Sequence, residues 1–243
     1  MSGGRILFRS ILFLLGFYGL TPWWAILLLL SLPFSRQGLL ARGIRVWCDL
    51  VFWLLRVVAN VRIDIRERNN LPAEGPYIVA AKHQSTIDAF FVFRHLPDVT
   101  ALGKRELFLV PVLGSILRKI GVAPVARGSG TAHRTLPDHD NLFIREQRVL
   151  VIFPEATRVP VGETVPLRPG IFHYYRDTGL PVIPLTTNAG CFWPAKGWRL
   201  KPGTATYAFG APLPAGLDQE AFMKALDHRL IEASDALCRQ ATD

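Results

Sequence analysis

The chain has 243 residues, a length that suits one catalytic domain with a short appendage and leaves little room for two full domains. Half of the residues are apolar, only 19% are charged, and the mean hydropathy is +0.25, which excludes a disordered chain and indicates apolar residues beyond an ordinary core. The 28 Lys and Arg exceed the 19 Asp and Glu, so the formal charge is +9. Such a chain suits an anionic membrane surface or a phosphorylated substrate at least as well as nucleic acid.

The first sixty residues carry much of the apolar surplus. Residues 10–34 contain no charged side chain, and at ~1.5 Å per helical residue this run exceeds the ~30 Å hydrocarbon core of a bilayer. The run is too long for a signal peptide and lacks a small-x-small cleavage site, so we expect it to be retained. Pro22 near its midpoint leaves three arrangements open: a straight span, a kinked span, or two shorter arms in one leaflet.

Residues 42–60 form a second apolar segment. At roughly 100° per residue, the four charged residues of this segment, three Arg and Asp49, fall within about 60° of one another and leave a broad apolar surface. The pattern is typical of a helix in a membrane interface, with a core helix bearing one solvated stripe as the alternative. Arginine also predominates on the flanks, which favours a cytoplasmic body. We expect residues 1–60 to anchor the chain and residues 61–243 to form the catalytic domain.

Beyond residue 60, short apolar runs alternate with helical stretches. Residues 61–66 alternate apolar and charged side chains, as in a half-buried strand. Five further runs are predicted to be strands: 77–81, 122–125, 149–153, 182–185 and 204–209. The order predicts an α/β fold with a mixed, largely parallel sheet flanked by helices, following the N-terminal membrane-associated helical segment, and it places the chemistry in loops after strand ends.

The predicted strand 77–81 runs into the sequence KHQSTID, which places His83 at a strand-to-helix turn and Asp88 in the first helical turn. A carboxylate bonded to one imidazole nitrogen fixes the tautomer and stabilises the imidazolium that forms when the other nitrogen takes a proton. The spacing from Ser85 to Asp88 also fits a capping box, in which Asp88 only starts the helix and His83 is an incidental turn residue. Spacing alone leaves both interpretations open.

A second polar cluster, FPEATR, follows the predicted strand 149–153. There Arg158 can hold a phosphate through a forked pair of hydrogen bonds, and Glu155 can orient that arginine or bind a hydroxyl. Arg127 and Lys104 add cations at comparable loop positions. Each charge alone could be a solvated surface group, so the prediction of an anion-binding site rests on their convergence.

The three cysteines stand far apart, without a C-x-x-C pair or a histidine at metal-ligand spacing. We therefore expect no metal site and no disulfide framework. The sequence also lacks the G-x-S-x-G frame of a serine hydrolase and any recognisable nucleic-acid-binding module, so neither class is favoured.

Four blocks in residues 77–190 resemble, in order, those of the glycerolipid acyltransferases, notably the bacterial 1-acyl-sn-glycerol-3-phosphate acyltransferases. The blocks are KHQSTID, GKRELFLVPVLGSILRKIGVAPVARGSG, VIFPEATR and LPVIPLTTNAG. The continuation FWPAKGWRLKPGTATYAFGAPLPAGLD is also similar, so the resemblance covers about three quarters of the chain. Four ordered blocks are a far more specific signal than one H-x-x-x-x-D, and the capping role of Asp88 then becomes secondary to catalysis.

The resemblance implies acyl transfer from a thioester, on acyl carrier protein or coenzyme A, to the sn-2 hydroxyl of lysophosphatidic acid, forming phosphatidic acid in phospholipid biosynthesis. It implies that His83 is the general base and that Asp88 orients it. Four residues would bind the glycerol phosphate: Lys104, Arg127, Glu155 and Arg158. The resemblance implies no cofactor beyond the acyl donor, no nucleic-acid partner, and a place on the bacterial inner membrane with the catalytic domain on the cytoplasmic side.

The chain departs from the family pattern in ways that bear on the acceptor. Ala156 replaces the usual glycine of block three; if this position needs positive φ, alanine costs on the order of 1 kcal/mol. Ala126 stands where a polar residue usually precedes the arginine of block two, and Gln147 and Arg148 replace a common glycine before block three. A different lysolipid acceptor, such as lyso-ornithine lipid, is therefore one alternative. A catalytically idle membrane protein that binds lipid or carrier protein is the other.

Overall fold

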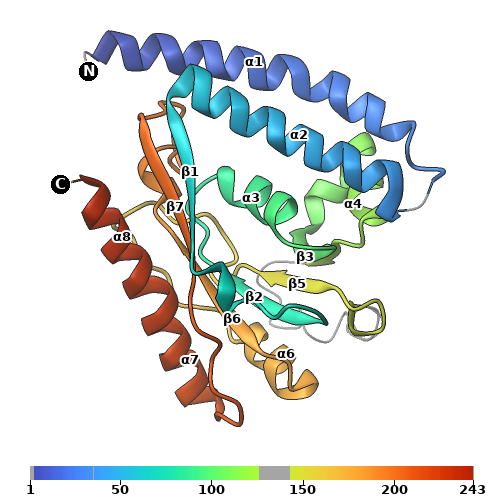
Figure 1. Cartoon of the computed structure of the whole chain (residues 1–243), viewed down its shortest axis with the longest axis vertical. Helices are drawn as coiled ribbons and strands as arrows, with labels where there is room; N and C mark the ends of the chain where they lie inside the picture. Colours follow the sequence, from blue (N-terminus) through green and yellow to red (C-terminus); the bar gives the residue numbers. More distant parts are fainter. Residues whose placement is uncertain (1–2, 35, 126–142, 243) are drawn as a thin grey trace.

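The computed structural model describes residues 3–34, 36–125 and 143–242. In these residues seven strands form one sheet in the order β1-β7-β6-β2-β5-β3-β4 (Figure 1). The strands are β1 Val61–Arg66, β2 Tyr77–Ala81, β3 Val99–Lys104, β4 Ala123–Val125, β5 Val149–Ile152, β6 Val182–Thr187 and β7 Gly203–Phe209. Five are mutually parallel, while β1 and β7 pair in parallel with each other and run antiparallel to the rest. The predicted mixed, largely parallel sheet is confirmed.

Helices cover both faces of this sheet. Their bounds are α1 Gly3–Leu29, α2 Ala41–Leu54, α3 Ile87–His95, α4 Pro111–Lys119, α6 Gly170–Thr178, α7 Gln219–Asp227 and α8 Ala233–Thr242. Short helical turns extend several of them: η1 Arg36–Leu40, η2 Leu55–Ala59, η3 Arg68–Asn70, η4 Arg105–Leu109, η5 Ala189–Cys191 and η6 His228–Glu232. Asp218 caps α7 by accepting a hydrogen bond from the Ala221 N–H at 2.8 Å.

The central strand β2 has all five of its residues buried because helices lie over both of its faces. Tyr77, Val79 and Ala81 point into a core shared with α1, α2 and α3. Ile78 and Ala80 point to the opposite side, into a core shared with α6 and α7. Successive side chains of a strand alternate between faces, so a strand covered on both sides becomes an uninterrupted apolar run. The fold is therefore a three-layer arrangement with β2 at its centre.

Helix α1 packs on the body of the molecule through one face only. Phe13 and Phe17 are buried in the core shared with the sheet, and the Ser10 hydroxyl accepts a hydrogen bond from the Leu200 N–H at 2.9 Å. Pro22 lies within a continuous helix, and α2 runs beside α1 (Figure 1). Asn60, in the left-handed region with φ 54°, then ends the helical segment before β1. The N-terminal helices and the sheet thus share one core.

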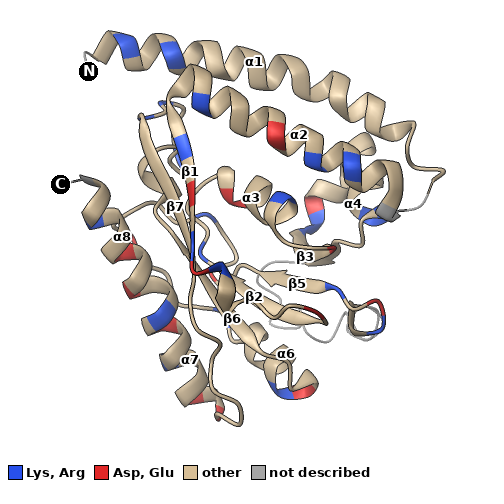
Figure 2. Ribbon diagram, viewed as in Figure 1, with Lys and Arg blue, Asp and Glu red and all other residues tan. Residues whose placement is uncertain are grey.

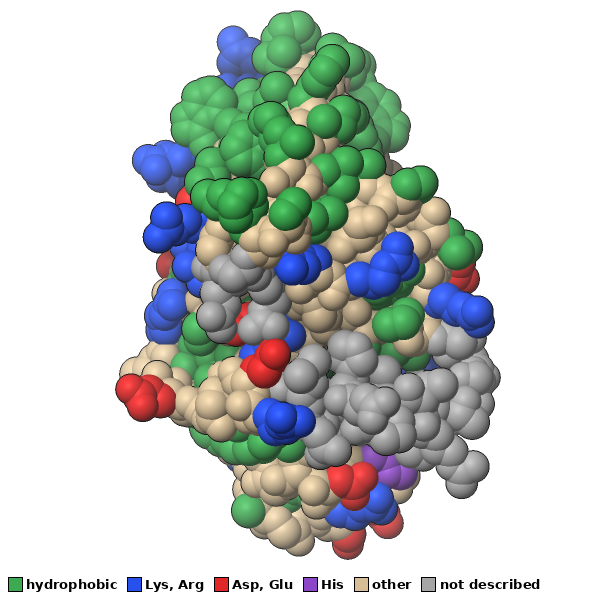
Figure 3. Space-filling view, turned by 90° about the vertical axis from the view of Figure 1, so that its right-hand side faces the viewer, with side chains coloured by type: hydrophobic (Ala, Val, Ile, Leu, Met, Phe, Trp, Pro, Cys, Tyr) green, Lys and Arg blue, Asp and Glu red, His purple; other side chains and the backbone are tan. Residues whose placement is uncertain are grey.

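The other face of α1 is apolar and exposed. Its large exposed side chains are Phe8, Ile11, Leu12, Leu15, Tyr18, Leu20, Trp23, Ile26 and Leu27. Lys and Arg residues of α1 lie only near its N-terminal end (Figure 2), and hydrophobic side chains gather where α1 and α2 form the top of the molecule (Figure 3). By length and a mean hydropathy of 1.8, α1 is also a candidate membrane span. An exposed apolar surface of this kind suits association with a membrane.

Candidate active site

The loop between β2 and α3 brings His83 and Asp88 together. The His83 Nδ1 atom lies 3.0 Å from the Asp88 Oδ2 atom. Asp88 is buried, and its Oδ2 also accepts the backbone N–H groups of Gln84 and Ser85, each at 2.8 Å. These donors compensate the carboxylate for the water that it loses on burial. Asp88 therefore organises the turn, as the capping interpretation requires, and also contacts the imidazole, as the catalytic interpretation requires.

The two nitrogens of the His83 imidazole differ: Nδ1 contacts Asp88, and Nε2 lies on the other side of the ring. With an ionised Asp88, Nδ1 is the nitrogen that carries the proton and donates, so Nε2 has a free lone pair. The His83 side chain is 17% exposed, so its ring is partly accessible, while the Asp88 side chain is 1% exposed. The ring of His83 also stacks on Phe153 with centroids 4.2 Å apart. The arrangement can take a proton from a group that reaches Nε2.

Glu155 contacts this turn and so links the VIFPEATR block to the KHQSTID block. Its Oε1 forms a buried ion pair with the Lys82 ammonium, and its Oε2 accepts the backbone N–H of His83 at 2.9 Å. Burial raises the pKa of Glu155 above its ordinary value, and the charge of Lys82 opposes that rise. Glu155 thus holds the backbone of His83 in place. From the sequence, Glu155 is expected to orient Arg158 or bind a hydroxyl and, by the resemblance, to bind the glycerol phosphate, while Lys82 has no predicted role.

The segment after β5 also contacts the segment after β2. The Val159 N–H donates to the carbonyl of His83 at 2.8 Å, and Arg158 Nη1 donates to the Thr86 hydroxyl at 2.7 Å. Strands β2 and β5 are parallel neighbours, with Ala80 opposite Ile152, so their following loops leave the sheet at the same edge. Arg158 therefore lies beside the turn that carries His83.

The two other cations that are predicted to bind phosphate, Lys104 and Arg127, end or follow strands that are further from the histidine turn. Lys104 ends β3 at the same edge of the sheet, but one strand further along, and its exposed ammonium lies 3.7 Å from a Glu106 carboxylate oxygen. Strand β4 ends at Val125 beside β3, and Arg127 follows it outside the described residues. The described geometry thus gathers His83, Asp88, Glu155 and Arg158, with Lys104 along the same edge.

Two positions where the sequence departs from the family pattern have left-handed backbones. Ala156 has a φ of 56° and Gln147 a φ of 54°, in the region that favours glycine. The Ala156 N–H closes a turn by donating to the Phe153 carbonyl at 2.9 Å. Because Ala156 adopts a positive φ, its methyl group costs on the order of 1 kcal/mol in the loop that carries Glu155 and Arg158.

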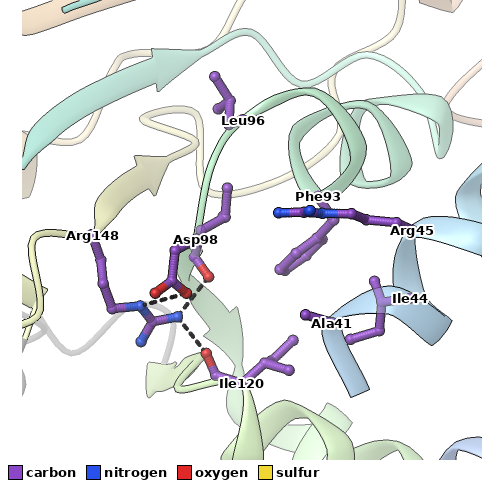
Figure 4. A pocket seen from close by; sticks show the side chains of 9 residues that line it. Ala41, Ile44, Arg45, Phe93, Leu96, Asp98, Ile120 and Arg148 are labelled. Carbon is purple, nitrogen blue, oxygen red and sulfur yellow. Dashed lines mark hydrogen bonds and ion pairs between the residues drawn. The ribbon is translucent and has the colours of Figure 1, made fainter. Parts of the chain in front are cut away.

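A separate cavity (Figure 4) lies at the starts of strands β3 and β5, whereas His83 follows the end of β2. It is lined from α2 by residues such as Arg45 and from the strand starts by Asp98 and the buried Arg148. Arg148 Nη2 donates to the carbonyls of Val99 and Ile120 at 2.7 and 2.6 Å, and its Nε lies 3.3 Å from an Asp98 oxygen. Arg148 therefore ties β3 and β5 to the end of α4. Neither His83 nor Asp88 lines this cavity.

Comparisons with known proteins agree on the class. Residues 62–188 match the family model described as Acyltransferase. The chain is 35% identical over 170 residues to the 1-acyl-sn-glycerol-3-phosphate acyltransferase of Pseudomonas aeruginosa, covering 70% of this chain and 66% of the relative. It is 29% identical over 191 residues to the enzyme of the same name from Saccharomyces cerevisiae, covering 76% of this chain and 62% of the relative. This chain therefore belongs to the Acyltransferase family.

A solved structure has the same fold. The crystal structure of the 1-acyl-sn-glycerophosphate (LPA) acyltransferase PlsC from Thermotoga maritima superposes with a TM-score of 0.76, covering 95% of this chain and 97% of that one. The two sequences are 19% identical, so this likeness establishes the fold. The chain spans slightly less than two thirds of the length of each of the two curated relatives.

Proposed function

We propose that this protein transfers an acyl group from a thioester to the sn-2 hydroxyl of lysophosphatidic acid and so forms phosphatidic acid. The observation that carries the proposal is the His83 Nδ1 to Asp88 Oδ2 contact of 3.0 Å, which leaves Nε2 as a base in a partly exposed ring at the edge of the sheet. The names of the bacterial and yeast relatives, 1-acyl-sn-glycerol-3-phosphate acyltransferase, support this choice of acceptor.

His83 would act as a general base in this reaction. Its Nε2 takes the proton of the acceptor hydroxyl as that oxygen attacks the thioester carbonyl carbon. The carbon–sulfur bond then breaks, and the departing thiolate recovers the proton from the imidazolium, so that ester and thiol are the products. Asp88 stabilises the imidazolium that exists between these steps. A positioned base of this kind typically contributes ~10²- to 10⁴-fold to the rate.

The glycerol phosphate would bind beside the imidazole. Arg158 is hydrogen-bonded to Thr86 in the same turn as His83, which places a guanidinium near the base. A guanidinium can bind two phosphate oxygens at once. We assign Lys104 and Arg127 to the same phosphate, and Glu155 to holding the histidine turn. The reaction would need no cofactor beyond its acyl donor, which is acyl-CoA or acyl carrier protein.

The exposed apolar face of α1 would bring the enzyme to its lipid acceptor. Its buried face already packs on the body through Phe13 and Phe17, which favours a helix lying in one leaflet over a helix that crosses the bilayer. Arg5 and Arg9 near the start of α1 suit anionic lipid headgroups. We place the protein on the cytoplasmic side of the bacterial inner membrane, with residues 1–60 as anchor and residues 61–243 as catalytic domain.

A panel of acceptors tests this function. Purified full-length protein is offered one acyl donor and, in separate vesicle-based assays, lysophosphatidic acid, lysophosphatidylethanolamine or lyso-ornithine lipid. We expect lysophosphatidic acid to give the highest kcat/KM by at least about tenfold, because Arg158 would form a charge-assisted hydrogen bond with its phosphate monoester. Turnover of lyso-ornithine lipid without turnover of lysophosphatidic acid would replace the proposed acceptor. No turnover of any lysolipid with either donor class would contradict an acyltransferase.

A further inference from the structure

The carboxylate of Asp88 has a partner that neither the block pattern nor the local turn provides. Its Oδ1 accepts the hydroxyl hydrogen of Tyr207 at an O–O distance of 2.7 Å. The other oxygen, Oδ2, faces His83 Nδ1 and the two backbone N–H groups of the turn. One oxygen of the Asp88 carboxylate thus contacts the imidazole, and the other contacts a phenol that lies 119 residues further along the chain.

The phenol of Tyr207 is held rigidly by two elements. Tyr207 lies in β7, opposite Thr187 of β6 in the antiparallel register, and is 1% exposed. Its ring stacks on Phe91 with centroids 3.7 Å apart and an interplanar angle of 7°. Phe91 and Asp88 lie three residues apart in α3 and so share one face of that helix. The helix that carries the carboxylate therefore also fixes the ring that binds it.

We propose that Tyr207 is a positioning residue of the active site, which acts through Asp88 by fixing the plane of its carboxylate. This inference rests on the proposed function. A carboxylate can turn about its terminal bond, because that torsion has a broad energy minimum. A donor held on Oδ1 removes this freedom and keeps Oδ2 directed at Nδ1, so the imidazole keeps the orientation in which Nε2 meets the acceptor hydroxyl.

The chemistry of the phenol suits this task. Burial raises the pKa of Tyr207 well above its ordinary value, and the negative charge of Asp88 raises it further. Tyr207 therefore stays protonated across the range in which the enzyme would work and remains a donor. A hydrogen bond from a neutral donor to a charged acceptor is also stronger than one between neutral groups.

A buried tyrosine elsewhere in the fold provides a matched control. Tyr175 in α6 lies on the opposite face of the sheet, where its hydroxyl donates to the Pro214 carbonyl at 2.7 Å and accepts the Leu217 N–H at 2.8 Å. Replacement of either tyrosine by phenylalanine removes one buried hydroxyl and preserves the ring. The two variants therefore make the same chemical change, but only Tyr207 contacts Asp88.

The test compares Tyr207→Phe, Tyr175→Phe and Asp88→Asn in the full-length protein, with lysophosphatidic acid in mixed micelles and one acyl thioester. Steady-state kcat and KM are measured together with thermal unfolding by circular dichroism. We expect Tyr207→Phe to lower kcat about tenfold with KM changed less than about twofold, because the lost contact acts on the orientation of the base and not on lipid binding. We expect Tyr175→Phe to lower the Tm and leave kcat unchanged.

The outcomes separate this inference from the proposed function. A kcat of Tyr207→Phe within about twofold of wild type, beside a strongly impaired Asp88→Asn, would overturn the role of Tyr207 and leave the His83–Asp88 mechanism standing. Full activity of Asp88→Asn would contradict that mechanism itself. Failure of Tyr207→Phe to fold, or an equal loss of kcat in Tyr175→Phe, would assign the hydroxyl to the stability of the fold and would also overturn the inference.

Discussion

Replacing His83 by glutamine is expected to lower kcat for phosphatidic acid formation by about 10²- to 10⁴-fold, because an amide cannot accept the hydroxyl proton. Glutamine retains polar atoms on a side chain of similar reach, so KM for lysophosphatidic acid should change little. The measurement is steady-state turnover of lysophosphatidic acid in mixed micelles at saturating acyl thioester.

The control for this prediction is His228→Gln. His228 lies on the exposed surface of η6, where its Nε2 is 3.5 Å from Glu232, and it should keep wild-type kcat when replaced. If His83→Gln turned over at the rate of His228→Gln, the imidazole of residue 83 would not be the base. A loss of both lipid binding and cooperative unfolding would instead report a misfolded variant, and Asp88→Asn would then decide the point.

The buried ion pair beneath the histidine turn gives the second large prediction. Glu155→Gln is expected to lower the free energy of unfolding by about 3–5 kcal/mol, because the Lys82 ammonium would lose its carboxylate in a site where both side chains are at most 2% exposed. The reciprocal variant, Lys82→Met, should cost a similar amount. The double variant Lys82→Met/Glu155→Leu should recover part of the loss, since neither charge is then left buried alone.

An exposed ion pair serves as the control for this prediction. Lys196 Nζ and a Glu163 oxygen are 3.8 Å apart with both side chains largely in solvent, and Glu163→Gln should change the free energy of unfolding by no more than about 0.5 kcal/mol. Chemical denaturation of all four variants in the same detergent makes the comparison. A Glu155→Gln cost as small as that of Glu163→Gln would mean that the Lys82–Glu155 pair does not stabilise the loop that carries His83.

Local patterns in the sequence were enough to predict most of the sheet. Strands such as β2 and β5 lie under helices on both faces, so each is a short apolar run between turn residues. Strand β3 was missed because its sequence VTALGK mixes polar and apolar residues and contains Gly103. Its side chains are buried at the start and exposed toward Lys104, a pattern without a clear period.

The histidine–aspartate contact was also predictable, because both residues belong to one strand-to-helix turn and are five positions apart. The partners that support this contact were not predictable from spacing. Lys82 meets Glu155 only because β2 and β5 are neighbours in a register that places Ala80 opposite Ile152. The sequence alone does not show that β5 is the neighbour of β2, nor in which register the two strands pair.

Tyr207 was missed for the same reason over a longer separation. It reaches Asp88 because β7 lies beside β6 in the antiparallel direction, which brings Tyr207 against α3. Read along the sequence, Tyr207 is an ordinary aromatic residue in a strand of the kind that fills cores. Long-range pairing, more than residue type, is therefore what separates the predictable part of this site from the rest.

In the proposed mechanism, the acyl group passes directly from the thioester to the lipid alcohol while His83 holds the proton. Rapid-quench mixing of the enzyme with an acyl-labelled thioester tests it, first without acceptor and then with lysophosphatidic acid. We expect no covalent label on the protein in either case, and label in phosphatidic acid that accumulates linearly from the first turnover. Stoichiometric acyl label on the chain, formed without acceptor and passed to lysophosphatidic acid when it is added, would contradict it.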